Sequence, residues 1–381
     1  MLAVLSAAIV VTLLTSAVAL LRCGGQRVEG SLPLSLAGFM AVLFTSGLDV
    51  GLIMLPLTEF PRYAREPAYQ FANPLAVAFG FWGFLVWGFY FLTTFYFLAI
   101  EPRVRFFERP VVKLLHNAVI VGTSAFTAHL LLTNLPFYAP ALGDAGRYAV
   151  VAVTVLLAVV SSTHIRYVRA LSVGSMWLFA ALVAAMWLAS GMGVAGLATG
   201  AVDLGAYFTA LPRFVLPLSD YHGFYLFWWF SWSIMIGQFV SRFVGRMRTW
   251  QLAASLLVVP SIPLAAWLLV LYGYHREQIR VPAPLAAAMV VVGVVFVVNS
   301  LDSLIRLYSD NLGLTTARVG TGRYVAGHWL LMCSLVLAFQ FTPLRIEWIG
   351  LAVIALYAAI YGLLLMRAVG ARSVVPDLDA G

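Results

Sequence analysis

Aromatic residues gather inside two long apolar segments of the chain, where their rings could bind a cation. In residues 73–100 they are Trp82, Trp87 and Tyr90, and in residues 221–243 Trp229 stands among further tryptophans. Trp87 and Tyr90, three apart, share one face of a helix, whereas Trp82, five before Trp87, points about 140° away. The three could form two walls of a pocket that Trp229 closes. Such a cage suits a quaternary ammonium group, which has no N–H to donate and is held by ring faces; the alternative is a set of lipid-facing or packing residues.

The segment 34–57 is irregular in its middle, between Thr45 and Pro56. Gly47 and Gly51 flank Leu48 and Asp49, and two glycines with a proline weaken a helix. An unwound stretch at membrane depth is tolerated where it lines a cavity, and it exposes carbonyl oxygens to ions and substrates. The alternative is a packing face of small residues. Asp49 favours the cavity, because an acid within a membrane span is costly, and we expect it to carry a proton or to neutralise a cationic substrate.

Hydroxyl and amide oxygens in two other segments could ligate a hard cation. Asn299 and Ser300 lie near the end of residues 283–307, and Thr123 lies within residues 113–133. Asp302 and Arg306 are four apart on the same helix, so we expect them to pair.

The composition predicts an all-α integral membrane protein. Of 381 residues, 62% are hydrophobic and 10% charged, far from the balance of a soluble domain. A helix needs about 20 apolar residues to cross the hydrocarbon layer. We therefore expect eleven transmembrane helices at residues 2–21, 34–57, 73–100, 113–133, 148–165, 172–198, 221–243, 249–273, 283–307, 324–342 and 348–368. Residues 203–216 are too polar to span and predict an amphipathic helix at the interface.

The basic residues predict the orientation in a cell (inner) membrane. With the N-terminus outside and the C-terminus in the cytoplasm, 16 of the 23 Lys and Arg residues fall on the cytoplasmic side, as the positive-inside rule requires. The two cysteines are far apart and no histidine pair has metal-ligand spacing. The sequence has no P-loop. We therefore expect no cofactor, no metal beyond Na⁺, no nucleic-acid partner and no enzyme activity.

Four motifs, in order along the chain, resemble the betaine/choline/carnitine transporter family. Residues 224–248 read FYLFWWFSWSIMIGQFVSRFVGRMR, similar to the family's W-W-x-S-W, then G-x-F, then an arginine-rich turn. Trp82, Trp87 and Tyr90 resemble its aromatic box, GLDVG resembles its stretch G-M-G-I-G, and residues 299–303 resemble T-S-A-D-S. The likeness covers about residues 34–368.

The resemblance implies a neurotransmitter-sodium-symporter-like fold of two inverted five-helix repeats. The divisions are an accessory span and loop at 1–33, the first repeat at 34–200, an interfacial segment at 201–220, the second repeat at 221–368 and a short cytoplasmic tail at 369–381. The implied substrate site lies among Trp82, Trp87, Tyr90, Trp229, Gly47, Gly51 and Asp49. An inner pathway is implied for Trp228, Trp232 and Phe239, and an ion site for Thr45, Leu48, Asn299, Ser300 and Thr123. The resemblance also implies a homotrimer.

Residues and resemblance together favour a secondary active transporter of betaine, choline, carnitine or similar compounds by alternating access, coupled to Na⁺ or H⁺. Its partners would be a small-molecule substrate and the lipid bilayer. The alternatives are an amino-acid or other amine carrier on the same scaffold, a channel, a membrane-embedded enzyme or a non-transporting membrane protein.

Overall fold

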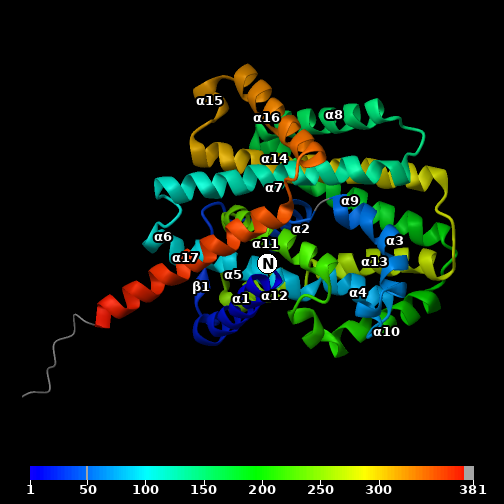
Figure 1. Ribbon diagram of the computed structural model, residues 1–381, viewed down its shortest axis with the longest axis horizontal. Helices are drawn as coiled ribbons and strands as arrows, with labels where there is room; N and C mark the ends of the chain where they lie inside the picture. Colours follow the sequence, from blue (N-terminus) through cyan, green and yellow to red (C-terminus); the bar gives the residue numbers. More distant parts are fainter. Residues whose placement is uncertain (49, 373–381) are drawn as a thin grey trace, which may run out of the picture.

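The structure, a computed structural model, describes residues 1–48 and 50–372 and is almost entirely helical (Figure 1). Within these residues nine helices are long and apolar enough to cross a membrane, and a bent pair, α2 (Leu36–Ser46) and α3 (Val50–Arg65), makes a tenth. The one expected span missing from this count is residues 221–243. The structure has a helix there, α11 (Asp220–Ser241), whose 22 residues are long enough to cross at 1.5 Å per residue.

The remaining elements follow the expected order of segments. Up to residue 215 they are α1 (Leu2–Cys23), η1 (Pro67–Tyr69), α4 (Pro74–Trp82), η2 (Phe84–Val86), α5 (Trp87–Phe95), η3 (Tyr96–Ile100), α6 (Glu101–Val104), α7 (Pro110–Tyr138), α8 (Asp144–Ser162), α9 (Ile165–Ala189), α10 (Val194–Thr209) and η4 (Leu211–Val215). Beyond α11 they are α12 (Thr249–Leu257), α13 (Ser261–Arg276), α14 (Ala283–Leu312), α15 (Thr316–Val319), α16 (Thr321–Phe341) and α17 (Ile346–Arg372).

Helix contacts recur in matched pairs, as two repeated halves require. The long helices α7 and α14 lie side by side through the molecule, with α8 and α16 on one side of them and α3, α5 and α11 on the other (Figure 1). Each helix of the first half has a counterpart in the second: α2/α3 corresponds to α11, α4/α5 to α12/α13, α7 to α14, α8 to α16 and α9 to α17. The contact of α14 with α8 then corresponds to that of α7 with α16, and the contact of α14 with α9 to that of α7 with α17. The contact of α11 with α5 corresponds to that of α3 with α13.

Three of the spans are interrupted. The span 34–57 breaks after Ser46, and α2 and α3 meet at 58°. The span 73–100 is interrupted between Trp82 and Trp87, where α4 ends, a short 3₁₀ turn follows and α5 begins. Its counterpart in the second half is interrupted before Ser261, between α12 and α13. We expected only the first of these breaks.

Two expected boundaries differ from the structure by nine residues each. The sixth span ends at Ala189 rather than at residue 198, and the next helix, α10, begins at Val194 rather than at residue 203. α10 packs on α4 and α13, with Tyr207 buried, so one face of this segment covers these two helices.

A short extended segment joins the first loop to the C-terminal end of α11. β1 (Arg27–Val28) pairs antiparallel with β2 (Met247–Arg248), with Arg27 opposite Arg248. The backbone N–H of Gly30 donates to the carbonyl oxygen of Val244, and a Cβ at Gly30 would lie 2.2 Å from the carbonyl oxygen of Ser241. Only glycine fits so close to another backbone.

Candidate functional site

Four aromatic side chains from α4, α5 and α11 meet beside the break between α2 and α3. The ring centroid of Trp229 lies 6.1 Å from that of Trp82, 6.0 Å from that of Trp87 and 5.4 Å from that of Tyr90. All four side chains are at least nine-tenths buried, so they do not face lipid. The structure therefore brings together the rings that the sequence pattern singled out.

Gly47 ends α2 directly against these rings. The Tyr90 hydroxyl donates to the carbonyl oxygen of Gly47 at 3.2 Å, and a Cβ at Gly47 would lie 3.4 Å from the Tyr90 ring and 3.6 Å from that of Trp87. Both are ordinary van der Waals separations, so the rings of α5 would touch a side chain here without a clash. The close atom is the carbonyl oxygen of Leu43 in α2 itself, 2.6 Å from such a Cβ. Gly51 lies in the first turn of α3, and Asp49 lies outside the described residues.

The second break, in the span of Trp82 and Trp87, is stabilised by the same indoles. The Trp229 N–H donates to the carbonyl oxygen of Phe81 at 2.7 Å, and the Trp87 N–H donates to that of Trp82 at 3.0 Å. Both carbonyls lie where the helical hydrogen bonds stop, and buried carbonyls need such partners.

The backbone donors of the break are also paired. The N–H of Phe84, a residue with φ of 45°, donates to the Ser261 hydroxyl at 2.9 Å. The N–H of Leu85 donates to the Tyr207 hydroxyl at 3.3 Å. The interruption is therefore fully accommodated by α13 and α10, and it gives the ring cluster a fixed frame.

A small cavity lies between the rings. Its lining residues are Gly47, Leu48, Trp82, Tyr90, Trp228, Trp229 and Trp232. Water-sized spheres fit in only about 10 Å³ of it, the room that about one water molecule needs. A trimethylammonium group is several times larger, so the rings must separate to admit one.

The implied inner-pathway residues fall into two groups. Trp228 and Trp232 line the cavity, and their indole N–H groups, like that of Trp82, are buried without a hydrogen-bond partner. Phe239 lies two turns further along α11 and packs on Phe243 with centroids 5.2 Å apart, so it is not part of the cavity wall.

Three of the implied ion ligands meet at the end of α2. The Ser300 hydroxyl of α14 donates to the carbonyl oxygen of Leu48 at 2.7 Å and approaches that of Thr45 at 3.4 Å. A hydroxyl with two carbonyl oxygens within hydrogen-bond reach of it offers suitable ligands for Na⁺.

The other two implied ligands are not joined to this group by hydrogen bonds. Asn299 accepts a hydrogen bond from Ser172 of α9 at 3.0 Å through its side-chain oxygen, and its amide nitrogen has no partner. The Thr123 hydroxyl is likewise buried and unpartnered.

The expected ion pair between Asp302 and Arg306 is wrong. The buried Asp302 carboxylate accepts hydrogen bonds from Ser161 of α8 at 2.5 Å and from Ser303 at 3.2 Å. Arg306 instead lies 4.0 Å from Asp310, another turn along α14. Helical spacing predicted the pair, but Asp302 faces the interface with α8.

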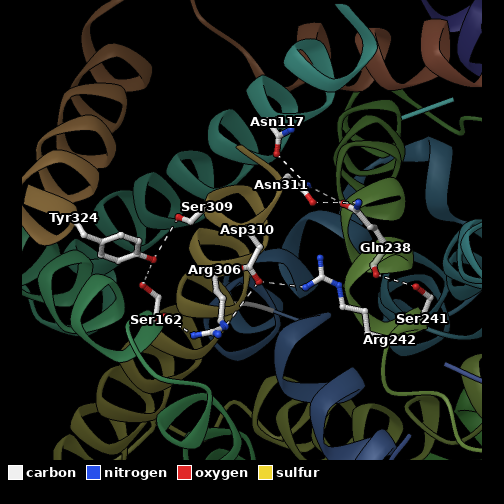
Figure 2. Close-up of polar contacts among 10 residues, drawn as sticks. All are labelled: Asn117, Ser162, Gln238, Ser241, Arg242, Arg306, Ser309, Asp310, Asn311 and Tyr324. Atoms are coloured by element: carbon white, nitrogen blue, oxygen red, sulfur yellow. Dashed lines mark hydrogen bonds and ion pairs between the residues drawn. The ribbon is translucent and has the colours of Figure 1, made fainter. Parts of the chain in front are cut away.

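A polar network, shown in Figure 2, joins five helices near the C-terminal end of α11. Asn311 donates to Asn117 of α7 and to Gln238 of α11, both at 3.1 Å. Asp310 lies 3.4 Å from Arg242 and 4.0 Å from Arg306. On the α8 side, Ser162 hydrogen-bonds to Tyr324 of α16 at 2.9 Å. The network ties α7, α8, α11, α14 and α16 together below the cavity.

A second polar cluster, which sequence reasoning missed, lies at the other end of α11. The buried Glu59 carboxylate of α3 accepts hydrogen bonds from the hydroxyls of Tyr63, Tyr221 and Tyr225. The sequence did contain a signal for this cluster. Glu59 lies four residues before Tyr63 on one helix, and Tyr221 and Tyr225 lie four residues apart on another.

The fold and this site describe a multi-pass helical membrane protein with a buried aromatic cavity at a broken span. Within the described residues no group of three or more His, Cys, Asp and Glu side chains could hold a metal ion. No family model matches the chain.

The curated relatives are named as transporters. An uncharacterized transporter of Mycobacterium bovis and one of Mycobacterium tuberculosis are each 27% identical over 300 residues, which are 65% of this chain and 50% of the relative. The chain thus spans about half the length of these relatives. A glycine betaine transporter of Vibrio parahaemolyticus is 33% identical over 100 residues, 22% of this chain and 19% of that protein. A solved Na⁺-coupled sialic acid symporter, in a substrate-bound outward-open state, aligns with a TM-score of 0.49 and 15% identity over 93% of this chain and 82% of that one.

Proposed function

We propose that the protein is a secondary active transporter of quaternary or methylated ammonium compounds. The observation that carries the proposal is the convergence of Trp82, Trp87, Tyr90 and Trp229 on the broken end of α2. Ring faces in a water-poor cavity bind a methylated cation without hydrogen bonds, and the broken span supplies carbonyl oxygens beside it. The names of the mycobacterial and Vibrio relatives support transport and, for the latter, a betaine as substrate.

The transport cycle we propose is alternating access around this cavity. The first repeat would be residues 34–200 and the second 221–368, with 1–33 and 201–220 as additions and 369–381 as a tail. The matched helix contacts support two such halves that rock against each other. The excess of arginine at one set of loops supports an N-terminus outside and a C-terminus in the cytoplasm of a cell (inner) membrane.

The proposed coupling ion binds at the Ser300 hydroxyl and the carbonyl oxygens of Thr45 and Leu48. The oxygens gathered there support Na⁺, whereas Asp49 in the sequence supports H⁺. Because the ion would join α14 to the end of α2, its binding would favour the conformation in which these two elements touch.

The decisive experiment is uptake of radiolabelled betaine, choline and carnitine into proteoliposomes with an imposed Na⁺ or H⁺ gradient. We expect saturable accumulation that depends on one of the two gradients. Gradient-independent flux that does not saturate would indicate a channel, and the absence of uptake together with the absence of binding would contradict the proposal.

The second candidate is an amino-acid or other amine carrier on the same scaffold. The unpartnered indole N–H groups of Trp82, Trp228 and Trp232 suit the carboxylate of an amino acid as well as that of betaine or carnitine. Competition between betaine and unmethylated amino acids separates the two, because a cage of ring faces prefers the methylated cation.

A further inference from the structure

The Glu59 cluster connects α3 to α11, the helix that carries the cavity residues Trp228, Trp229 and Trp232. Tyr221 and Tyr225 both belong to α11 and both donate to the same carboxylate oxygen of Glu59 on α3, Tyr225 at 2.5 Å. Tyr63, on α3 itself, donates to the other oxygen at 3.0 Å. Two of the three hydrogen bonds therefore join α3 to α11, and the third stays within α3.

The cluster is held by neutral donors rather than by an ion pair. Arg62, the neighbouring cation, binds Glu66 at 2.6 Å and lies 3.8 Å over the ring of Tyr221. The phenols can leave the carboxylate without separating two opposite charges in a medium of low dielectric constant. Such bonds are well suited to an interface that has to open and reform.

An aromatic layer fills the space between Glu59 and the cavity. Phe81 of α4 stacks on His222 at 4.4 Å and contacts Tyr63 at 5.2 Å and Tyr225 at 5.1 Å. Tyr225 in turn meets Trp82 at 5.3 Å, a wall of the cavity. A molecule that reaches the cavity from this side has to separate α3 from α11 and α4.

The opposite side is closed by different bonds on the same helix. From Tyr225 to Gln238 of α11 the rise is about 20 Å at 1.5 Å per residue. There Gln238 and Arg242 join Asn311 and Asp310 of α14 (Figure 2). The cavity therefore lies between two separate sets of inter-helix hydrogen bonds. We call the end of the cavity with Glu59 the Glu59 side and the end with Asp310 the Asp310 side.

We propose that the Glu59 carboxylate is the latch that closes the cavity on the α3 side, and that its bonds to Tyr221 and Tyr225 break when this side opens. The inference rests on the proposed function, since a carrier needs closures that open in turn. It adds that the first opening step is the separation of α3 from α11 at one carboxylate.

Accessibility of a reporter cysteine tests the latch without any substrate. Leu48→Cys places a thiol on the cavity wall and keeps the backbone carbonyl, in a chain whose two cysteines, Cys23 and Cys333, are changed to serine. The purified variant is reconstituted, and a membrane-impermeant maleimide is added from the Glu59 side. With both Tyr221→Phe and Tyr225→Phe, we expect labelling about tenfold faster or more, because two hydrogen bonds to a charged group no longer favour the closed state.

Tyr63→Phe is the matched control. It removes one phenol from the same carboxylate at the same depth but breaks no bond between helices, so labelling should stay within about twofold of the parent. Equal acceleration by Tyr63→Phe, or no acceleration by the double variant, overturns the latch. Where the double variant does not fold, the single Tyr221→Phe variant is judged by the same criterion.

The two proposals fail in distinguishable ways. If the labelling pattern holds but no methylated amine is taken up or bound, the latch stands and the substrate assignment is wrong. If uptake is observed but the tyrosine variants label like Tyr63→Phe, transport stands and the latch is wrong.

Discussion

The indole N–H of Trp229 donates to the carbonyl oxygen of Phe81 at 2.7 Å, across the interface between α11 and α4. In an unbroken helix this carbonyl would accept from Leu85, whose N–H instead donates to Tyr207. Trp87 does the same for the carbonyl of Trp82. The aromatic cluster and the interruption of the span are therefore one feature. Trp229 presents its ring to the cavity, Trp87 packs behind it against Tyr90 and Trp229, and both indoles donate to the broken backbone.

This double role predicts different outcomes for two changes at Trp229. Trp229→Ala removes the ring and should abolish uptake. Trp229→Phe keeps an aromatic face but leaves the Phe81 carbonyl unpaired, so uptake should persist with weaker substrate binding and a stability loss of about 1–3 kcal/mol. Uptake kinetics and thermal unfolding in detergent measure the two effects.

The control for Trp229 is Trp177→Ala, at an exposed tryptophan of α9. It removes the same side chain from an exposed position outside the lining of the aromatic cavity, and uptake should be unchanged. If Trp229→Ala transports like Trp177→Ala, the ring cluster is packing and not a binding site.

Ser300 provides a test of the ion site. Ser300→Ala removes the hydroxyl that bridges α14 to the carbonyl oxygens of Leu48 and Thr45. We expect the Na⁺ concentration for half-maximal uptake to rise about tenfold, as the loss of one hard ligand would cause. Ser124→Ala is the control, because the Ser124 hydroxyl is equally buried but bonds only to Ile120 of its own helix. If uptake by the parent protein does not depend on the Na⁺ concentration, the proposed Na⁺ site is ruled out.

At Gly237 even one added methyl group should lower the stability of the protein. A Cβ there would lie 2.3 Å from the hydroxyl oxygen and 2.8 Å from the backbone carbon of Thr93, where α11 crosses α5. Gly237→Ala should therefore cost about 1–3 kcal/mol through overpacking. Gly205→Ala, in α10 with open space around the new methyl group, should be neutral or slightly stabilising. Thermal unfolding of the two variants decides, and equal unfolding temperatures would contradict the close helix contact.

Composition and local pattern predicted the spans and the first break, because these depend on nearest neighbours in the chain. Gly47 marks the end of α2 as expected, while Pro56, also taken as a weak point, lies inside α3. The break after Trp82 depends on Trp229, Ser261 and Tyr207, which lie far away in sequence. Only Gly83 and the five-residue spacing of the two tryptophans hinted at it.

Side-chain partners were predicted less well than helices, for the same reason. The i, i+4 rule for Asp302 and Arg306 describes an isolated helix, whereas α14 is packed on several sides and offers Asp302 the Ser161 hydroxyl at 2.5 Å. Glu59 was missed because its tyrosines come from two helices. Local spacing pointed Asp302 to the wrong partner. For Glu59 it offered Tyr63 and the pair Tyr221 and Tyr225, but not the fact that the two helices meet.

The Asp310 side should respond to mutation in the opposite sense to the Glu59 side. Asn311→Leu removes the hydrogen bonds that join α14 to Asn117 and Gln238 and fills a similar volume with a group that cannot form them. In the Leu48→Cys reporter chain, maleimide added from the Asp310 side should then react about tenfold faster, while reaction from the Glu59 side should be unchanged or slower.

Ser241→Ala is the companion control at this end of the cavity. Its hydroxyl belongs to the same network in Figure 2 but bonds only to the carbonyl oxygen of Gln238 within α11. Its loss should leave both labelling rates near those of the parent.

Because opening one side of a two-state carrier draws population from the other, Asn311→Leu should also slow labelling from the Glu59 side in the Tyr221→Phe, Tyr225→Phe background. Faster labelling from both sides at once would mean that the two closures are independent, and the cavity would then behave as a pore rather than as an alternating site.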